Sequence, residues 1–314
     1  MQSDRLRLMA KVARLTHEQG LRQVDIAEAL HISQARVSRL LKEAADAGIV
    51  RTVVVLPEGV HPGLEEEIAR RYGLIDVVVV DTDGAGADPR QSIGAAAADY
   101  LDATLTGGDV IGVSTWSGTI LAAVESLRPK ARPVADRVIQ LFGGVGRPEA
   151  QVQATRITGR LAEVTGAQPV FVPTPGVVGS AAIREAMLSD PSVAAVAAQW
   201  ADVTMSVVGI GSLSPSPLLQ VSGNAITTAD QVQLRERGAV GDVCLRYFDA
   251  QGERVVGSLD DRVLGIDADQ LRAIPRRVAL AGGIDKASAI RAALLGGWVN
   301  VLITDLAVAR RLVA

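Results

Sequence analysis

The segment 23–42, QVDIAEALHISQARVSRLLK, carries polar side chains at a spacing that suits contact with DNA. In the major groove Gln34 could pair bidentately with adenine and Arg39 with guanine, whereas Arg36 and Lys42 are better placed for phosphates. The N-terminal part of the second helix of a helix-turn-helix lies in that groove. The residues that we expect to face DNA are therefore Ser33, Gln34, Ala35, Arg36, Ser38, Arg39 and Lys42.

The apolar spacing of the same segment fits the twenty-residue helix-turn-helix template, counted from Gln23. The small residue at position 5 is Ala27, and the apolar positions 4, 8, 10, 15 and 18 hold Ile26, Leu30, Ile32, Val37 and Leu40. His31 stands where the template usually has glycine, which predicts a left-handed backbone conformation for this histidine. A small helical bundle used for dimerisation or protein docking is the alternative interpretation.

A second group of polar residues lies between an expected strand at 109–113 and an expected helix at 119–127. The turn 112–119, GVSTWSGT, offers hydroxyls and free backbone N–H groups, which can bind an anion at a helix start. Ligands bind α/β sheets at the C-terminal ends of parallel strands. The P-loop pattern GxxxxGK[ST] is absent. A tight strand-to-helix turn with a capping Ser or Thr explains the segment equally well.

Three further positions are candidates for ligand contact. The segment 140–146, QLFGGVG, ends an expected strand in closely spaced glycines, with Gln153 on the next helix, although a sharp turn alone would explain the glycines. Asp242 could bind sugar hydroxyls or cap a turn. Lys286 precedes the expected helix 287–297, where a cation opposes the helix dipole unless a phosphate binds there. A solvated lysine is the alternative.

Composition limits the class of protein. The chain has 314 residues, 48 % of them hydrophobic, which favours one large domain plus a small one. No apolar run approaches the 18 residues that a membrane span needs, and the N-terminus lacks the pattern of a signal peptide, so we expect a cytoplasmic protein. The single cysteine, Cys244, excludes an intrachain disulfide and a multi-cysteine metal site. We expect no cofactor and no metal.

Charge is distributed unevenly along the chain. Residues 1–56 carry nine Lys/Arg and six Asp/Glu, a net charge of +3, whereas residues 57–314 carry 23 and 29, a net charge of −6. This asymmetry fits a DNA-binding head on an acidic body.

The expected elements place these groups in two domains. Residues 1–56 fit three helices, followed by a short strand from Ile49, Val50 and 53–55 that suggests a winged helix-turn-helix. The Pro- and Gly-rich segment 57–63 is the expected linker. In 64–314 continuous Val/Ile runs alternate with helical patterns, which predicts a mostly parallel sheet covered by helices, an α/β fold.

The combination of a short helix-turn-helix with the motifs IGVSTWSGT, QLFGGVG, VGIG, GAVGDVCLRYFD and DKASAIRAALLGGWVNVLITD resembles the SorC family (SorC/DeoR group) of bacterial sugar-responsive transcriptional regulators. The resemblance implies a Rossmann-like effector domain related to glucosamine-6-phosphate deaminase, ribose-5-phosphate isomerase and CoA transferases. It also implies a phosphorylated sugar or related metabolite as ligand, and an oligomer, often a tetramer, on palindromic operators.

The resemblance further implies which residues bind the effector. A phosphate pocket would include Ser114, Thr115, Ser117, Gly118 and Thr119 with Lys286, and Trp116 belongs to the same loop. The sugar side would be lined by Gln140, Gly143, Gly144, Gln153 and Asp242. Many members have a WGRT-like loop, but this chain has Trp116-Ser117-Gly118-Thr119 without an arginine. This departure weakens the loop's share in phosphate binding and is compatible with an unphosphorylated sugar or polyol.

The sequence therefore predicts a transcriptional regulator, a dimer or tetramer, whose affinity for operator DNA is controlled by a sugar, polyol or sugar phosphate. The operon would serve carbohydrate catabolism. The alternative is a sugar-phosphate isomerase or deaminase with an appended helix-turn-helix. Such an enzyme needs a general acid and a general base, and the pocket motifs offer only Asp242 and Lys286, with no histidine. We expect no enzymatic activity.

Overall fold

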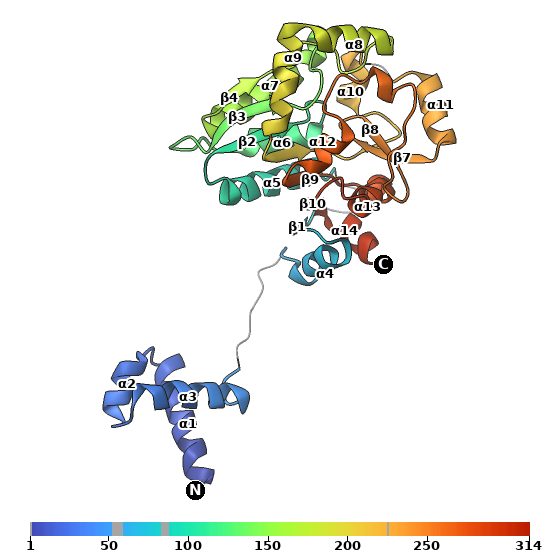
Figure 1. The fold of residues 1–314 in the computed structure, drawn as a ribbon. Coiled ribbons are helices and arrows are strands. Elements are labelled where there is room, and N and C mark those ends of the chain that lie inside the picture. The colour runs from blue at the N-terminus through green and yellow to red at the C-terminus, as the bar shows by residue number, and fades with distance from the viewer. Residues whose placement is uncertain (1, 52–58, 83–87, 225) are drawn as a thin grey trace. The chain divides into compact units, whose positions relative to one another are not determined.

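A computed structural model describes residues 2–51, 59–82, 88–224 and 226–314 (Figure 1). The chain divides into two compact units, residues 1–58 and 59–314, and each is described by itself.

The first unit is built from three helices, α1 (Gln2–His17), α2 (Gln23–Ala29) and α3 (Gln34–Asp46). The Ser33 side chain caps α3 by accepting the N–H of Arg36, as is usual for serine at a helix start. Arg5 on α1 forms an ion pair with Glu43 on α3. The core consists of the apolar residues Met9, Val12, Ala13, Ile26, Ala27, Val37, Leu40 and Ala44.

The turn between α2 and α3 confirms the prediction made for His31, whose φ is 50°. The left-handed backbone ends α2 and lets the Ile32 N–H bond the Ala27 carbonyl at 3.0 Å, so that Ile32 packs against the core. Of the strand expected after the third helix, Ile49 and Val50 lie in a bend, and Val53–Val55 fall outside the described residues.

The second unit contains the predicted parallel sheet, in the strand order β1-β10-β9-β5-β2-β3-β4. Neighbouring strands pair parallel throughout. The strands are β1 (Asp76–Val80), β2 (Asp109–Val113), β3 (Ala135–Gln140), β4 (Gln168–Val170), β5 (Met205–Val208), β9 (Arg276–Leu280) and β10 (Val301–Asp305). A smaller antiparallel sheet, which the sequence did not predict, is formed by β6 (Gly211–Ser212), β7 (Ala239–Val243) and β8 (Arg246–Asp249).

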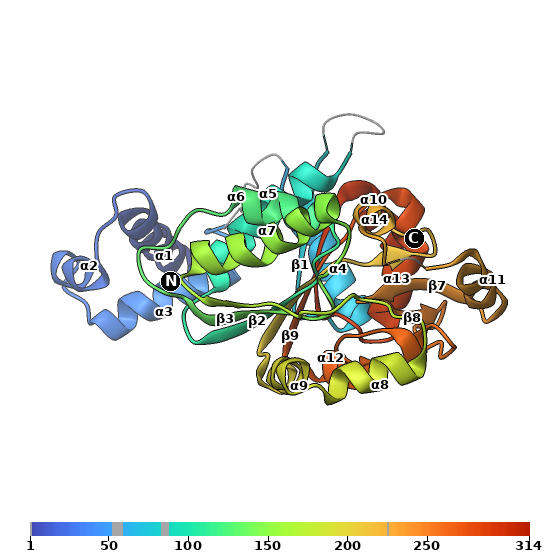
Figure 2. The ribbon, with the colours of Figure 1, turned by 90° about the horizontal axis from the view of Figure 1, so that it is seen from above.

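Helices cover both faces of the parallel sheet. Figure 2 shows α5, α6 and α7 on one face and α8, α9 and α12 on the other. The helices are α4 (Pro62–Tyr72), α5 (Arg90–Thr104), α6 (Gly118–Ser126), α7 (Pro148–Thr165), α8 (Ala181–Ser189), α9 (Pro191–Ala198), α10 (Pro217–Ser222), α11 (Thr228–Glu236), α12 (Ala268–Ala273), α13 (Ala287–Leu295) and α14 (Leu306–Val313). Short 3₁₀ turns occupy Gln199–Asp202, Asp260–Arg262 and Ile284–Lys286. None of the helices in the described ranges is long and apolar enough to cross a membrane.

Helices α5 and α6 approach each other closely at Gly94. A Cβ atom at this position would lie 2.8 Å from the Cβ of Ala122 and 2.9 Å from the backbone N of Ala123. The neighbouring α5 residues Ala97 and Ala98 are buried and small. This contact fixes the N-terminal half of α5 against α6, and Arg90 and Ile93 at the start of α5 belong to the site described below.

We expect Gly94→Ala to lower the free energy of unfolding by about 1–3 kcal/mol, because the overpacking outweighs the better helix propensity of alanine. The measurement is urea denaturation followed by circular dichroism. Gly159→Ala on α7 is the matched control, since no atom lies within 4 Å of its Cβ position, and it should gain up to about 1 kcal/mol. Equal stability of the two variants would contradict the close approach.

Candidate functional site

A cavity of about 490 Å³ lies at the C-terminal edge of the parallel sheet. Its walls come from the loops that follow β2, β5 and β9, from the start of α5 and from the turn between β7 and β8. This edge is where ligands bind open α/β sheets. The walls combine hydroxyls, carboxylates and two cationic side chains with apolar groups such as Trp116, Phe142 and Tyr247.

The hydroxyl-rich loop after β2 contributes most of its predicted residues to the cavity. Ser114, Trp116, Ser117, Gly118 and Thr119 line it, whereas Thr115 is fully buried outside the lining. The Ser117 Oγ accepts the Ile120 N–H at 3.3 Å and caps α6. The Ser114 Oγ accepts the Gly209 N–H at 3.4 Å, which joins this loop to the one after β5.

Most of the residues predicted for the sugar side do not line the cavity. Gln140, Gly143, Gly144 and Gln153 lie outside the lining of the cavity, and only Asp242 reaches it. The side chain of Gln140 instead accepts the Val172 N–H at 2.8 Å. A Cβ on Gly144 would lie 2.6 Å from the Gln140 carboxamide, and one on Gly143 would meet the Pro175 carbonyl oxygen. These glycines therefore permit close backbone packing, in agreement with the turn interpretation.

Asp242 holds a tight turn at the wall of the cavity. Its Oδ2 accepts the Leu245 N–H at 2.9 Å, and Cys244 and Leu245 adopt left-handed φ values of 53° and 62°. Two successive left-handed residues are typical of a type I′ hairpin turn. Without glycine, each left-handed residue costs about 1–3 kcal/mol of folding free energy. Burial raises the pKa of Asp242 to about 6, and the bond from Leu245 and the charge of Lys286 oppose the shift.

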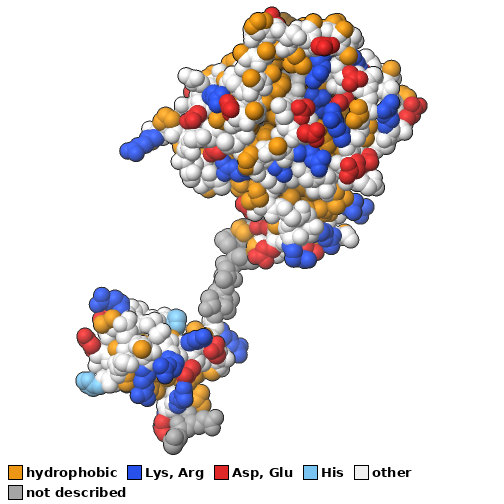
Figure 3. All heavy atoms as spheres, in the orientation of Figure 1, with side chains coloured by type: hydrophobic (Ala, Val, Ile, Leu, Met, Phe, Trp, Pro, Cys, Tyr) orange, Lys and Arg blue, Asp and Glu red, His pale blue; other side chains and the backbone are white. Residues whose placement is uncertain are grey.

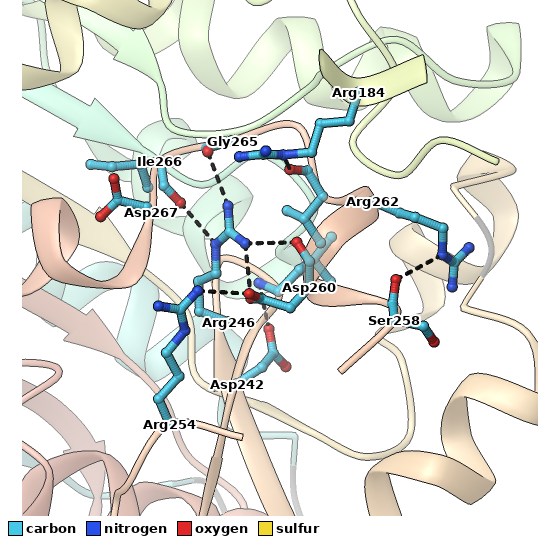
Figure 4. A network of polar contacts seen from close by, with 12 residues as sticks. Arg184, Asp242, Arg246, Arg254, Ser258, Asp260, Arg262, Gly265, Ile266 and Asp267 are labelled. Atoms are coloured by element: carbon cyan, nitrogen blue, oxygen red, sulfur yellow. Dashed lines mark hydrogen bonds and ion pairs between the residues drawn. The ribbon is translucent and has the colours of Figure 1, made fainter. Parts of the chain in front are cut away.

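Figure 4 shows Arg246, the residue directly after this turn, with its guanidinium directed at Asp260, Gly265 and Ile266. Its side chain is only 2 % exposed. The guanidinium donates to the carbonyls of Ile266 at 2.9 Å and Gly265 at 3.1 Å, and it forms an ion pair with Asp260 at 2.9 Å. Arg254 contacts the second oxygen of the same carboxylate at 2.6 Å. Burial lowers the pKa of Arg246, and the Asp260 carboxylate opposes this effect.

Among the residues that the structure describes, two cationic side chains line the cavity, and the sequence predicted one of them. Lys286 is the N-cap residue of α13, which confirms its expected place at a helix start. Arg90, the first residue of α5, was not predicted. The signal that could have found it is its position: the helix that follows a parallel strand starts at the same sheet edge as the other strand-to-helix loops.

Metal and thiol chemistry find little support at this site. Among the residues that the structure describes, no group of three or more His, Cys, Asp or Glu side chains could hold a metal ion. The thiol of Cys244 is buried, and burial raises its pKa, so it behaves as a small apolar group.

In the first unit the predicted DNA-facing residues share an exposed surface of α3. Ser33, Gln34, Ala35, Arg36, Ser38, Arg39 and Lys42 are all exposed. Val37, Leu40 and Ala44 point into the core from the same helix. Figure 3 shows Lys and Arg side chains of this unit gathered on the visible face. The surface has the charge and polarity that a major-groove reader needs.

Comparisons with known proteins find relatives that match both units of the chain. The family model "Putative sugar-binding domain" matches residues 62–314. The chain is 30 % identical over 316 residues to the deoxyribonucleoside regulator of Bacillus subtilis, covering 100 % of this chain and 99 % of the relative. The full-length sorbitol operon regulator SorC from Klebsiella pneumoniae has a similar structure, with a TM-score of 0.74 at 26 % identity, covering 99 % of this chain and 100 % of that one. The sugar-binding domain of the regulator DeoR from Pseudomonas syringae pv. tomato covers 81 % of this chain and 100 % of its own at 37 % identity, with a TM-score of 0.64.

We expect Arg246→Met to lower the free energy of unfolding by about 3–5 kcal/mol, because it leaves the Asp260 carboxylate buried without its main partner. Urea denaturation measures the change. Arg254→Met is the matched control: it removes a guanidinium from the same carboxylate, but at 34 % exposure, so the loss should stay near 1 kcal/mol or below. Equal losses would show that Arg246 has no special role.

Proposed function

This chain belongs to the SorC family of sugar-binding transcriptional regulators, and we propose that a sugar, polyol or sugar phosphate in the cavity of the second unit controls its affinity for operator DNA. The observation that carries the proposal is that a chain with an exposed polar surface on α3 and a ligand-sized cavity matches such regulators over its full length.

The chemistry of the cavity supports a polyhydroxylated effector. Asp242 and the hydroxyls of Ser114, Ser117 and Thr119 can accept hydrogen bonds from sugar hydroxyls, and Trp116 offers an apolar face to C–H groups. The named relatives regulate sorbitol and deoxyribonucleoside genes, and a further one, from Brucella abortus, regulates erythritol catabolism. We infer an operon for the catabolism of a carbohydrate or polyol.

We infer that the effector acts by preferring one arrangement of an oligomer, either a dimer or a tetramer. Its differential affinity for two arrangements is the free energy that changes DNA binding. Two copies of α3 would then read the two halves of a palindromic operator. Such a regulator acts in the cytoplasm, where chromosomal DNA lies.

We propose regulation in place of catalysis. Among the described residues, the carboxylates that line the cavity are Asp88, Asp242 and Asp285, and no histidine lines it. Asp88 is paired with Arg90, Asp242 accepts the Leu245 N–H, and Asp285 is exposed. Steady turnover of sugar phosphates by the purified protein, abolished in Asp242→Asn, would favour the enzyme alternative.

Gln34→Ala and Arg39→Ala should each weaken binding to DNA upstream of the protein's own gene by about 1–3 kcal/mol, because each removes a base contact. Gel-shift titration measures the loss. Lys42→Ala is the comparison variant: it should weaken binding to operator and unrelated DNA alike and reduce the salt slope by about 1, as expected for a phosphate contact. Unchanged affinity in both base-reading variants would place the recognition surface elsewhere.

Lys286→Ala should weaken the binding of a phosphorylated sugar while leaving DNA binding without effector intact, because the ammonium lies in the second unit. Calorimetry with sugar phosphates, alongside gel shift, checks both parts. Lys286→Arg keeps the positive charge and should retain most of the affinity. If Lys286→Ala binds sugar phosphates as the wild type does, Lys286 is a solvated lysine.

A further inference from the structure

The side chain of Arg90 lies across the start of α6. A Cβ atom on Gly118 would be 3.2 Å from Nη1 and 3.5 Å from Cδ of Arg90. Because Gly118 has no side chain, the Arg90 guanidinium fits in front of the α6 N-terminus. Ser117 caps the same helix end. A helix N-terminus carries partial positive charge and free N–H groups, so this guanidinium adds a full charge to a place that already favours anions.

The packing of α5 brings Arg90 to the cavity that the loops after β2 and β9 also line. Gly94 packs against Ala122 of α6, and Ile93 contacts the Cβ position of Gly282 in the loop after β9. Residues three and four apart lie on one face of a helix, so Arg90 shares the face of Ile93 and Gly94. Lys286 follows Gly282 by four residues and lines the same cavity.

Arg90 is held in this position by a weak partner. Its Nε donates to Oδ2 of Asp88 at 2.7 Å, and the two side chains are 54 % and 50 % exposed. Exposed ion pairs contribute about 0–1 kcal/mol. A phosphate dianion offers a guanidinium stronger, bidentate hydrogen bonds. A phosphate can therefore compete with the carboxylate for the guanidinium, and Asp88 keeps the Arg90 backbone N–H that it accepts at 3.1 Å.

The other carboxylates of the cavity do not oppose this exchange strongly. Asp285 is exposed, so its repulsion is screened by solvent and salt. Asp242 accepts the Leu245 N–H at the β7–β8 turn, and its charge is offset by nearby Lys286.

We propose that Arg90, together with Lys286, binds the phosphate group of a phosphorylated sugar effector, and that Asp88 occupies the guanidinium until the phosphate displaces it. The proposal rests on the proposed function and deepens it by selecting phosphorylated over unphosphorylated effectors. The arginine that the loop 116–119 lacks is supplied from α5, and Gly118 is the residue that makes room for it.

The test is calorimetric titration of the full-length protein with sorbitol 6-phosphate, 2-deoxyribose 5-phosphate, their unphosphorylated parents and inorganic phosphate. The wild type should bind at least one sugar phosphate more than tenfold more tightly than its parent. Arg90→Ala should lower that affinity by about ten- to a hundredfold, the range expected for charge-assisted bonds, and leave the affinity for the parent unchanged. Asp88→Asn should raise the affinity for the phosphate several-fold, because the competing carboxylate is removed.

Arg156→Ala is the matched control, since this exposed arginine forms an ion pair with Glu125 away from the cavity, and it should bind every probe as the wild type does. Unaltered DNA binding without effector shows that the variants are folded. Equal sugar-phosphate affinity in Arg90→Ala and the wild type would overturn the role of Arg90 but not the proposed function. If no probe binds the wild type or changes its affinity for operator DNA, the proposed function fails together with this inference.

Discussion

The guanidinium of Arg246 is the group on which the geometry of the cavity depends. It ties strand β8 to the segment 260–266, because it pairs with Asp260 and donates to the carbonyls of Gly265 and Ile266. The Ile266 N–H in turn bonds the Leu141 carbonyl at the end of β3. The small antiparallel sheet is thereby fixed to the edge of the large one, and Asp242 is held at the cavity wall. A charge buried this deeply persists only when its partners are present.

The parts of the fold that follow from local rules were predictable from the sequence. Continuous apolar runs require strands buried on both faces, which gave a parallel sheet between helices. A histidine at the glycine position of the helix-turn-helix required a left-handed residue, and His31 adopts that conformation. The apolar spacing of α3 separated its buried face from the exposed face that carries Gln34 and Arg39.

The parts of the site that depend on contacts between distant segments were not predictable. The glycines at 143 and 144 signal close approach, but only the fold reveals that Pro175 and Gln140 are the protein groups that approach them. Arg90 lines the cavity because Gly94 lets α5 pack closely against α6. No pattern in the local sequence predicts that contact. The apolar pattern of residues 242–249 predicts one strand, and the β7–β8 hairpin escaped prediction because its turn, Cys244-Leu245, adopts left-handed φ values without a glycine to signal it.

The three tryptophans of the chain share one arrangement. The indole N–H of Trp116 donates to the Gly143 carbonyl, that of Trp200 to the Gln140 carbonyl, and that of Trp298 to the Gly252 carbonyl. All three are buried in the second unit, and Trp116 also lines the cavity. The tryptophan emission of the protein therefore originates in the second unit, and one of the three indoles touches the space that an effector would fill. The tryptophan signal reports on the second unit, with no contribution from α1, α2 or α3.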